Sequence, residues 1–292
     1  MATLAEWVEG ARPRTLPAAV APVLAGSAVV AYEGSIALVP AALALLVTLA
    51  LQVGVNYAND YSDGIRGTDS DRVGPMRLVG SGAARPRQVL AAAVGSFVLA
   101  ALAGLAIVVV TGYWWLLIVG AVSIAAAWYY TGGRHPYGYF GLGELFVFIF
   151  FGLVAVGGTV YIQLGTVSQT AWLAAVAIGA LACAILVVNN LRDLDGDRAS
   201  GKRTLATRLG DRYTRWFYVG LLAAAAGGVV AIAALTTWWA LLGLVMVTVL
   251  ILPVRDVIGG ASGARLIPVL RQTGIAELLC AVGVFAGLWI GR

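Results

Sequence analysis

The sequence has few charged residues, only two cysteines and a single histidine. Asp, Glu, Lys and Arg make up 11% of its 292 residues, whereas 61% are hydrophobic and the mean hydropathy is +0.91. Soluble domains carry roughly a quarter charged residues, so this composition excludes an ordinary soluble protein. Without a cluster of Cys and His, zinc and iron–sulfur chemistry have no set of ligands. Any metal here would have to be bound by oxygen atoms.

The two cysteines, Cys183 and Cys280, lie in apolar stretches. We expect them to be small buried side chains rather than a disulfide or a metal site, because free cysteine behaves as a small hydrophobe. The N-terminus carries charged residues before its first apolar run and lacks the layout of a cleavable signal, so it is predicted to be a cytosolic lead-in.

Apolar stretches long enough to cross a bilayer, roughly 20 residues each, recur along the whole chain. The sequence therefore predicts an all-α polytopic membrane protein with one integral membrane domain over residues 1–292. We expect nine transmembrane helices, at 16–32, 36–61, 88–111, 113–130, 141–163, 171–191, 213–236, 238–257 and 266–290.

The basic residues are distributed unevenly between the two ends of these spans. Every Lys and Arg except Arg292 lies at the N-terminus or in and around the connections after the second, fourth, sixth and eighth spans. The positive-inside rule places these segments in the cytosol and the C-terminus outside a cell membrane. Because topology accounts for the net charge of +5, nucleic acid is not expected as a partner.

Half of the fourteen acidic residues crowd into two short segments. In the first segment, Asn56, Asp60 and Asp63 fall within about 60° of one another around a helix, because each residue advances by roughly 100°. They form one polar face at the cytosolic end of the second predicted span. In this segment, the role of Asp69 stays open.

The second segment repeats this arrangement on the sixth predicted span. Asn189, Asp193 and Asp197 are spaced i, i+4, i+8 and share a helix face, whereas Asp195 points elsewhere. Two carboxylates about 6 Å apart repel by roughly 3 kcal/mol at an effective dielectric constant near 20. Such stacking is unfavourable without a cation, and carboxylate and amide oxygens are the ligands of Mg²⁺.

Basic residues follow both acidic clusters. Arg72 and Arg77 come after the first cluster, and Lys202, the single lysine of the chain, comes after the second. Carboxylates, Mg²⁺ and Arg or Lys side chains together are what a diphosphate group requires. The alternative for either cluster alone is a solvated loop that only enforces topology, but two clusters with matching spacing favour a diphosphate site.

A third polar segment lies on the same side, after the fourth predicted span. Tyr130 and Arg134 are candidates to contact the diphosphate, while Tyr137 and Tyr139 would wall a pocket for an aromatic acceptor. The alternative is an interfacial loop with tyrosines at headgroup depth. Glu277, deep in the ninth span, is either functional or a packed hydrogen-bonding group.

The polar segments resemble those of the intramembrane aromatic prenyltransferases of the UbiA type. Within that superfamily the branch that prenylates 1,4-dihydroxy-2-naphthoate in menaquinone biosynthesis is the most similar. The resemblance runs from about Arg12 to Leu209 and, more loosely, to the end. The segments that carry it are ARPRTLP, NYANDYSDGIRGTDSDRVGP, YTGGRHPYGYFGLGE and NNLRDLDGDRASGKRTLATRLG.

The resemblance implies a nine-helix bundle around a central cavity that opens to the cytosol and sideways to lipid. It also implies roles for single residues. Asn56, Asp60 and Asp63 match the first metal motif of the family, and Asn189, Asp193 and Asp197 match the second. Arg134 and Lys202 match residues that contact diphosphate.

The predicted function is therefore Mg²⁺-dependent transfer of a polyprenyl chain from an allylic diphosphate to 1,4-dihydroxy-2-naphthoate, with loss of CO₂. Catalysis is assigned to Asp60, Asp63, Asp193, Asp197 and Tyr130. Two alternatives stay open: a sister prenyltransferase that uses 4-hydroxybenzoate or another ring, and a cation-coupled transporter. Transporter sites usually lie near the bilayer midplane, whereas these acids lie at helix ends. The oligomeric state and the prenyl chain length are not fixed by the sequence.

Overall fold

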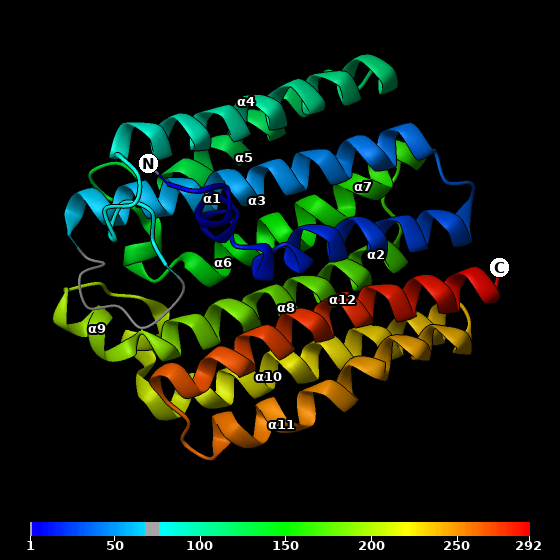
Figure 1. Ribbon diagram of the computed structural model, residues 1–292. Coiled ribbons are helices and arrows are strands. Elements are labelled where there is room, and N and C mark those ends of the chain that lie inside the picture. The colour runs from blue at the N-terminus through cyan, green and yellow to red at the C-terminus, as the bar shows by residue number, and fades with distance from the viewer. Residues whose placement is uncertain (1, 68–75) are drawn as a thin grey trace.

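The computed structural model describes residues 2–67 and 76–292, where helices are joined by short loops and no strand occurs (Figure 1). The N-terminal half contains α1 (Leu4–Gly10), η1 (Pro13–Thr15), α2 (Pro17–Glu33), α3 (Leu38–Arg66), α4 (Pro86–Thr111) and α5 (Leu116–Tyr129). The middle contains η2 (Tyr137–Phe140), α6 (Gly143–Val147), η3 (Phe148–Val154), α7 (Ala155–Leu164), α8 (Gln169–Arg192) and α9 (Leu194–Ala199). The last part contains α10 (Leu205–Leu235), η4 (Trp238–Val245), α11 (Met246–Ile258), η5 (Gly263–Leu266) and α12 (Ile267–Ile290).

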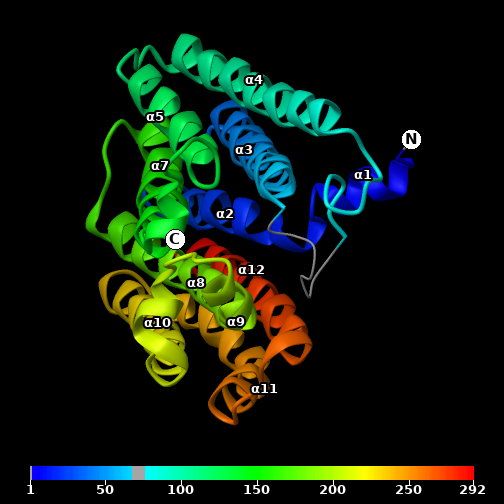
Figure 2. The same cartoon turned by 90° about the vertical axis from the view of Figure 1, so that its left-hand side faces the viewer.

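The long helices run side by side in one bundle. In Figure 1 the C-terminal ends of α3 and α8 lie at the left with α9, and the C-terminus of the chain lies at the right. We call the end that carries α9 the polar end. Figure 2, which looks along the bundle, shows α4 at one edge, α10 and α11 at the opposite edge, and α2, α7 and α8 between them.

Within the described residues, seven helical segments are long and apolar enough to cross a membrane. An eighth is formed if α1–η1 and α2 count as one span, which bends by 46° between Thr15 and Pro17. The helix α5 is apolar but has only 14 residues. The prediction of a polytopic all-helical membrane protein is confirmed, and the prediction of nine spans stays a prediction.

The length of α3 explains why its acidic residues lie at the polar end. Its 29 residues rise about 44 Å at 1.5 Å per residue, which exceeds the roughly 30 Å of a hydrocarbon core. The helix ends at Gly67, whose φ of 70° is the left-handed conformation that closes a helix, and its N–H bonds back to the carbonyl of Asp63. The last turns of α3 therefore carry its polar residues out of the apolar layer.

Small residues allow the closest helix contacts. The π-helical turn η3 packs against α8, and a Cβ added to Gly152 would lie 2.7 Å from the carbonyl oxygen of Ala175 and 2.9 Å from the Cα of Gly179. The helix α12 packs on η4 in the same way, through Gly283 and Gly287. Such contacts are typical of helix bundles in membranes. There the hydrophobic effect does not drive helices together, so their association depends on close van der Waals packing.

We expect Gly287→Val to destabilise the protein by about 3 kcal/mol, because added core volume forces the backbone to shift. A Cβ at this position would overlap the carbonyl group of Trp239. The melting temperature in detergent measures the effect. Gly220→Val is the control, since Gly220 lies on the exposed side of α10 with no atom within 4 Å of an added Cβ. Equal melting temperatures for the two variants would contradict the expected close contact.

Candidate active site

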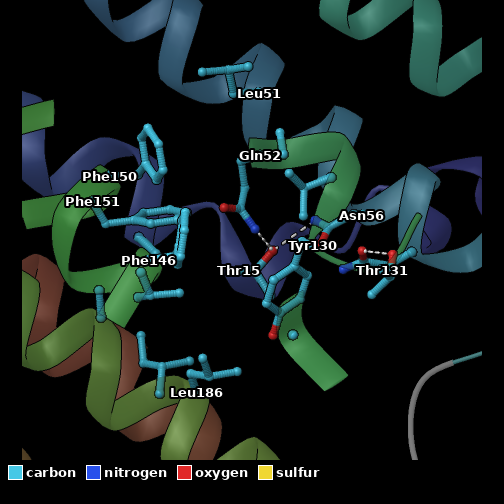
Figure 3. Close-up of a pocket in the computed structure, with 18 of the residues that line it drawn as sticks. Thr15, Leu51, Gln52, Asn56, Tyr130, Thr131, Phe146, Phe150, Phe151 and Leu186 are labelled. Atoms are coloured by element: carbon cyan, nitrogen blue, oxygen red, sulfur yellow. Dashed lines mark hydrogen bonds between the residues drawn. The ribbon is translucent and has the colours of Figure 1, made fainter. Parts of the chain in front are cut away.

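A large cavity of about 1820 Å³ opens within the bundle. Its walls come from α2, α3, α4, α5, η3, α7 and α8, with α9 and the η2 segment at the polar end. Asp63, Asp193 and Asp197 lie at the polar end of the cavity. Leu51, Phe146, Phe150 and Phe151 line its apolar part (Figure 3). The cavity is therefore charged at one end and hydrocarbon-like further in.

Asp63 is the most heavily contacted acid of the first cluster. Its side chain is 5% exposed and accepts a hydrogen bond of 2.5 Å from the hydroxyl of Tyr139. The guanidinium of Arg77 lies 3.6 Å and the ammonium of Lys202 3.7 Å from its carboxylate oxygens. Segments that are far apart in the sequence thus converge on one carboxylate, and the contact of Arg77 and Lys202 with a diphosphate stays a prediction.

Asp60 is oriented differently from Asp63, although both lie on α3. Its two carboxylate oxygens accept the backbone N–H groups of Leu78 (2.7 Å) and Val79 (3.0 Å), and it does not line the cavity. The side chain is buried and fixes the loop that follows the first cluster. The structure therefore separates Asp60 from Asp63, because the chain returning after α3 needs acceptors for its N–H groups.

In the second cluster, Arg192 connects two of the predicted residues. Its guanidinium donates to both oxygens of Asp193 at 2.7 Å and to the amide oxygen of Asn189 at 3.0 Å. Asp197 follows in α9, is 9% exposed, and accepts the backbone N–H of Lys202 on its carbonyl oxygen. These side chains all line the cavity.

Tyr139 contacts Asp63 of the first cluster and the basic residues that follow the second cluster. Two cations lie over its ring, with the guanidinium carbon of Arg66 5.6 Å and the ammonium of Lys202 4.6 Å from the ring centroid. Its carbonyl oxygen also accepts the N–H of Arg203 at 3.0 Å. Burial, together with the nearby Asp63 charge, raises the pKa of Tyr139 well above its usual range, so the phenol stays protonated and donates to Asp63.

The other tyrosines of the third segment also reach the cavity. Tyr130 lines it, and Tyr137 stacks on Phe146 with ring centroids 4.1 Å apart while its hydroxyl donates to the carbonyl of Ala126. Arg134 differs from the prediction: it is exposed and does not line the cavity. Arg66 bonds to the carbonyls of this loop instead.

Several other predicted residues can be placed. The side chain of Asp195 is fully exposed and pairs with Arg198, as expected for a residue off the shared face. Glu277 is fully buried away from the cavity, and its carboxylate has no hydrogen-bond partner within the described part of the chain. Arg72 and Asp69 lie outside the described residues.

Two cavity residues were missed by the sequence reasoning. Arg192 stands inside the second cluster and is the nearest basic residue to Asp193, which was the available signal. Gln52 lies one helical turn before Asn56 on the same face of α3, so the i, i+4 spacing extends the first motif inward. In the sequence, Arg192 cannot be told apart from a basic residue that sets membrane topology, and Gln52 cannot be told apart from a side chain that packs between helices.

The donor set fits a hard cation that is shared with a ligand. Among the residues that the structure describes, no three acidic, His or Cys side chains are grouped closely enough to hold a metal ion by themselves. The oxygens of Asp63, Asp193 and Asp197 nevertheless line one cavity, together with the amides of Asn56 and Asn189. Carboxylate and amide oxygens suit Mg²⁺, which usually takes part of its coordination from substrate phosphates.

A cavity with this polarity suits a molecule that has an anionic head and a long apolar tail. The fold and the site together define the class of protein as an intramembrane prenyltransferase. The chain belongs to the UbiA prenyltransferase family, whose model matches residues 19–267.

Curated relatives match the chain over its whole length. The 1,4-dihydroxy-2-naphthoate octaprenyltransferase of Mycobacterium tuberculosis is 53% identical over 292 residues, which cover 100% of this chain and 99% of the relative. The protein of the same name from Escherichia coli is 37% identical over 295 residues, covering 97% and 96%.

Solved structures share the fold at low sequence identity. A UbiA homolog from Aeropyrum pernix matches with a TM-score of 0.73 and 17% identity, covering 92% of this chain and 97% of that one. A UbiA homolog from Archaeoglobus fulgidus, described as bound to GPP and Mg²⁺, matches with a TM-score of 0.69 and 15% identity, covering 97% and 99%.

Proposed function

We propose that this protein transfers a polyprenyl chain from an allylic diphosphate to 1,4-dihydroxy-2-naphthoate, with loss of CO₂ and formation of the reduced form of a demethylmenaquinone. The observation that carries the proposal is the polarity of the cavity, which leads from two clusters of acids and cations into an aromatic and aliphatic interior. The choice of acceptor is supported by relatives with that activity in their names over the full length of the chain.

The charged residues at the polar end would hold the diphosphate. Lys202 and Arg77 lie on Asp63, and Arg192 lies on Asp193, so each cation is already in the cavity and needs only to exchange a carboxylate oxygen for a phosphate oxygen. Arginine and lysine are suited to this because charge-assisted bonds to phosphate are short and strong. Mg²⁺, when bound by Asp63, Asp193 and Asp197, would neutralise the charge that develops on the departing diphosphate.

The reaction breaks the allylic C–O bond, and its electron pair leaves with the diphosphate. The ring carbon that bears the carboxylate attacks the allylic carbon, and the C–CO₂ bond then breaks so that its electron pair restores the aromatic ring. The apolar walls around Phe146 and Phe150 exclude water, which would otherwise capture the allylic cation. The polar end binds the diphosphate and balances its charge, and the apolar interior keeps water away from the reacting carbon.

The orientation in the membrane follows from the charge distribution. We infer a single membrane domain of nine spans, with the bent α1–α2 segment and the short α5 each counted as one span. The polar end then faces the cytosol, because it carries the connections that hold the basic residues. The C-terminus faces outward from a cell membrane, and the cavity opens to the cytosol and to lipid.

A product assay tests the proposal. The purified protein in nanodiscs is incubated with geranylgeranyl diphosphate and either 1,4-dihydroxy-2-naphthoate or 4-hydroxybenzoate, with Mg²⁺ or with EDTA, and products are analysed by mass spectrometry. We expect a prenylated naphthoquinone only with the naphthoate and only with Mg²⁺. Product from hydroxybenzoate alone would overturn the acceptor, and product in EDTA would overturn the metal requirement.

A further inference from the structure

Three polar side chains of the cavity wall, Thr15, Gln52 and Asn56, form a connected group (Figure 3). The amide nitrogen of Gln52 donates to the hydroxyl oxygen of Thr15 at 3.0 Å. The amide nitrogen of Asn56 donates to the same oxygen at 3.0 Å and to the carbonyl of Ala11 at 2.9 Å. All three side chains line the cavity.

The hydroxyl of Thr15 fixes the direction of these bonds. A hydroxyl has one hydrogen, and Thr15 donates it to the carbonyl of Arg12 at 2.9 Å. The oxygen of Thr15 must therefore accept from both amides, so each amide turns its nitrogen toward Thr15. Arg12 has a φ of 55°, an uncommon conformation for a residue other than glycine. This backbone turn points its carbonyl at Thr15 and so determines how both amides lie.

The orientation of Gln52 leaves its amide oxygen as an acceptor without a donor. The side chain is 8% exposed, and this oxygen has no hydrogen-bond partner within the described part of the chain. Figure 3 shows the oxygen turned toward the side of Phe146, Phe150 and Phe151. A buried acceptor without a donor is unfavourable and is rare in native proteins, so its retention calls for a ligand or a water that donates to it.

The chemistry of the substrates decides which ligand donates. Diphosphate oxygens are acceptors, and a prenyl chain is a hydrocarbon, so neither can donate to an amide oxygen. The aromatic acceptor alone carries O–H groups. The position of Gln52 agrees with this, because it bonds to the neutral Thr15, which also accepts from Asn56, and the same cavity is lined by aromatic rings of η3 and α6. A flat aromatic ring with a hydroxyl at its edge could pack against such rings and donate to the amide oxygen of Gln52.

We propose that the amide oxygen of Gln52 accepts a hydrogen bond from a ring hydroxyl of the aromatic acceptor, with Thr15 holding the amide in the required orientation. The inference rests on the proposed function and adds the residue that distinguishes hydroxylated rings from others. An amide that can only accept at this point rejects a ring without the hydroxyl, because the acceptor oxygen would stay unpaired.

The test uses Gln52→Leu, which keeps the approximate size of the side chain and removes the acceptor. With saturating geranylgeranyl diphosphate, we expect the KM for 1,4-dihydroxy-2-naphthoate to rise about tenfold, which is the loss of one buried hydrogen bond. The KM for geranylgeranyl diphosphate should stay unchanged. Gln169→Leu is the control, because Gln169 is exposed at the start of α8 and does not line the cavity.

Acceptor analogues test the same bond on the wild-type protein, so the result does not depend on the folding of a variant. Inhibition constants are measured for 1-hydroxy-2-naphthoate, 4-hydroxy-2-naphthoate and 2-naphthoate. We expect one hydroxyl to tighten binding to the wild type about tenfold and to have no effect in Gln52→Leu. That pattern would also identify which hydroxyl is bound.

The role of Thr15 is tested by Thr15→Ser and Thr15→Val. Serine keeps the hydroxyl and should keep the discrimination between hydroxylated and plain rings, whereas valine should lose it. If wild-type protein prenylates the naphthoate but Gln52→Leu retains the full preference for hydroxylated rings, the inference is overturned and the oxygen binds only water. If wild-type protein prenylates no naphthoate, the proposed function itself fails.

Discussion

Asp63→Asn should lower kcat/KM for the prenyl diphosphate by about a thousandfold while leaving a folded protein. The carboxylate of Asp63 contacts Tyr139, Arg77 and Lys202, so it is the point where the charges of the polar end meet. An asparagine cannot balance those cations or bind Mg²⁺ as an anion. The expected loss corresponds to about 4 kcal/mol of transition-state stabilisation, a size typical of a metal that neutralises developing charge.

The same substitution at Asp60 provides a matched control on the same helix. Asp60→Asn replaces one of two oxygens that accept N–H groups from the 78–79 loop. It should therefore cost about 1–3 kcal/mol of stability, seen as a lower melting temperature, with a much smaller loss of turnover in the protein that remains folded. If Asp60→Asn removes activity as completely as Asp63→Asn without lowering the melting temperature, Asp60 belongs with the metal ligands as the sequence predicts.

Asp193→Asn is expected to have the second large effect, a loss of at least about a hundredfold in turnover. Asp193 forms a bidentate pair with Arg192, and the arginine side chain is 4% exposed. The substitution leaves that buried guanidinium without its anion and removes a proposed metal ligand from the second cluster, which together should cost several kcal/mol. Steady-state kinetics with varied Mg²⁺ would show a higher Mg²⁺ requirement as well as a lower kcat.

Asp195→Asn is the control for this prediction. Asp195 lies two residues later at the edge of the same cavity, but its side chain is fully exposed and pairs with the half-exposed Arg198. A surface pair of this kind contributes little, so kinetics and melting temperature should match the wild type. Equal losses for Asp193→Asn and Asp195→Asn would mean that net charge near α9, rather than a specific ligand, is what the enzyme needs.

The sequence predicts the fold class and several of the residues that line the cavity, because both depend on simple patterns. Long apolar runs predict helices, and the i, i+4 and i, i+7 spacing on one helix face brings Asn56 and Asp63 to the cavity. Family membership and prenyl transfer, expected from the resemblance of four polar segments, are confirmed by the comparisons.

The differences arise where a loop determines what a side chain contacts. Helical spacing places Asp60 beside Asp63, but only the path of residues 78–79 turns its oxygens to backbone N–H groups. Arg134 follows Gly133, whose positive φ is a feature of the loop and not of any periodic pattern. Arg192 was overlooked because a basic residue at a cytosolic helix end also fits the positive-inside rule.

Helix irregularities were equally hard to foresee. The π-helical turn η3 and the 3-10 helix η4 interrupt stretches that are uniformly apolar in sequence. Neither contains a proline, so no local signal marks the break. Their form follows from close contacts with α8 and α12, which are tertiary effects.

The shortness of α5 links the enzyme to the thickness of its bilayer. Fourteen residues rise about 21 Å, whereas the hydrocarbon layer is about 30 Å thick. With α5 as one of the nine spans inferred above, the lipids beside it would thin, or the helix would draw headgroups inward, at a modest cost for each ångström of mismatch. Because α5 is also a wall of the cavity, thinning of the bilayer there would act directly on the cavity that is proposed to hold the prenyl chain. The length of the lipid acyl chains, which sets the thickness of the bilayer, would in this way affect the shape of the active site.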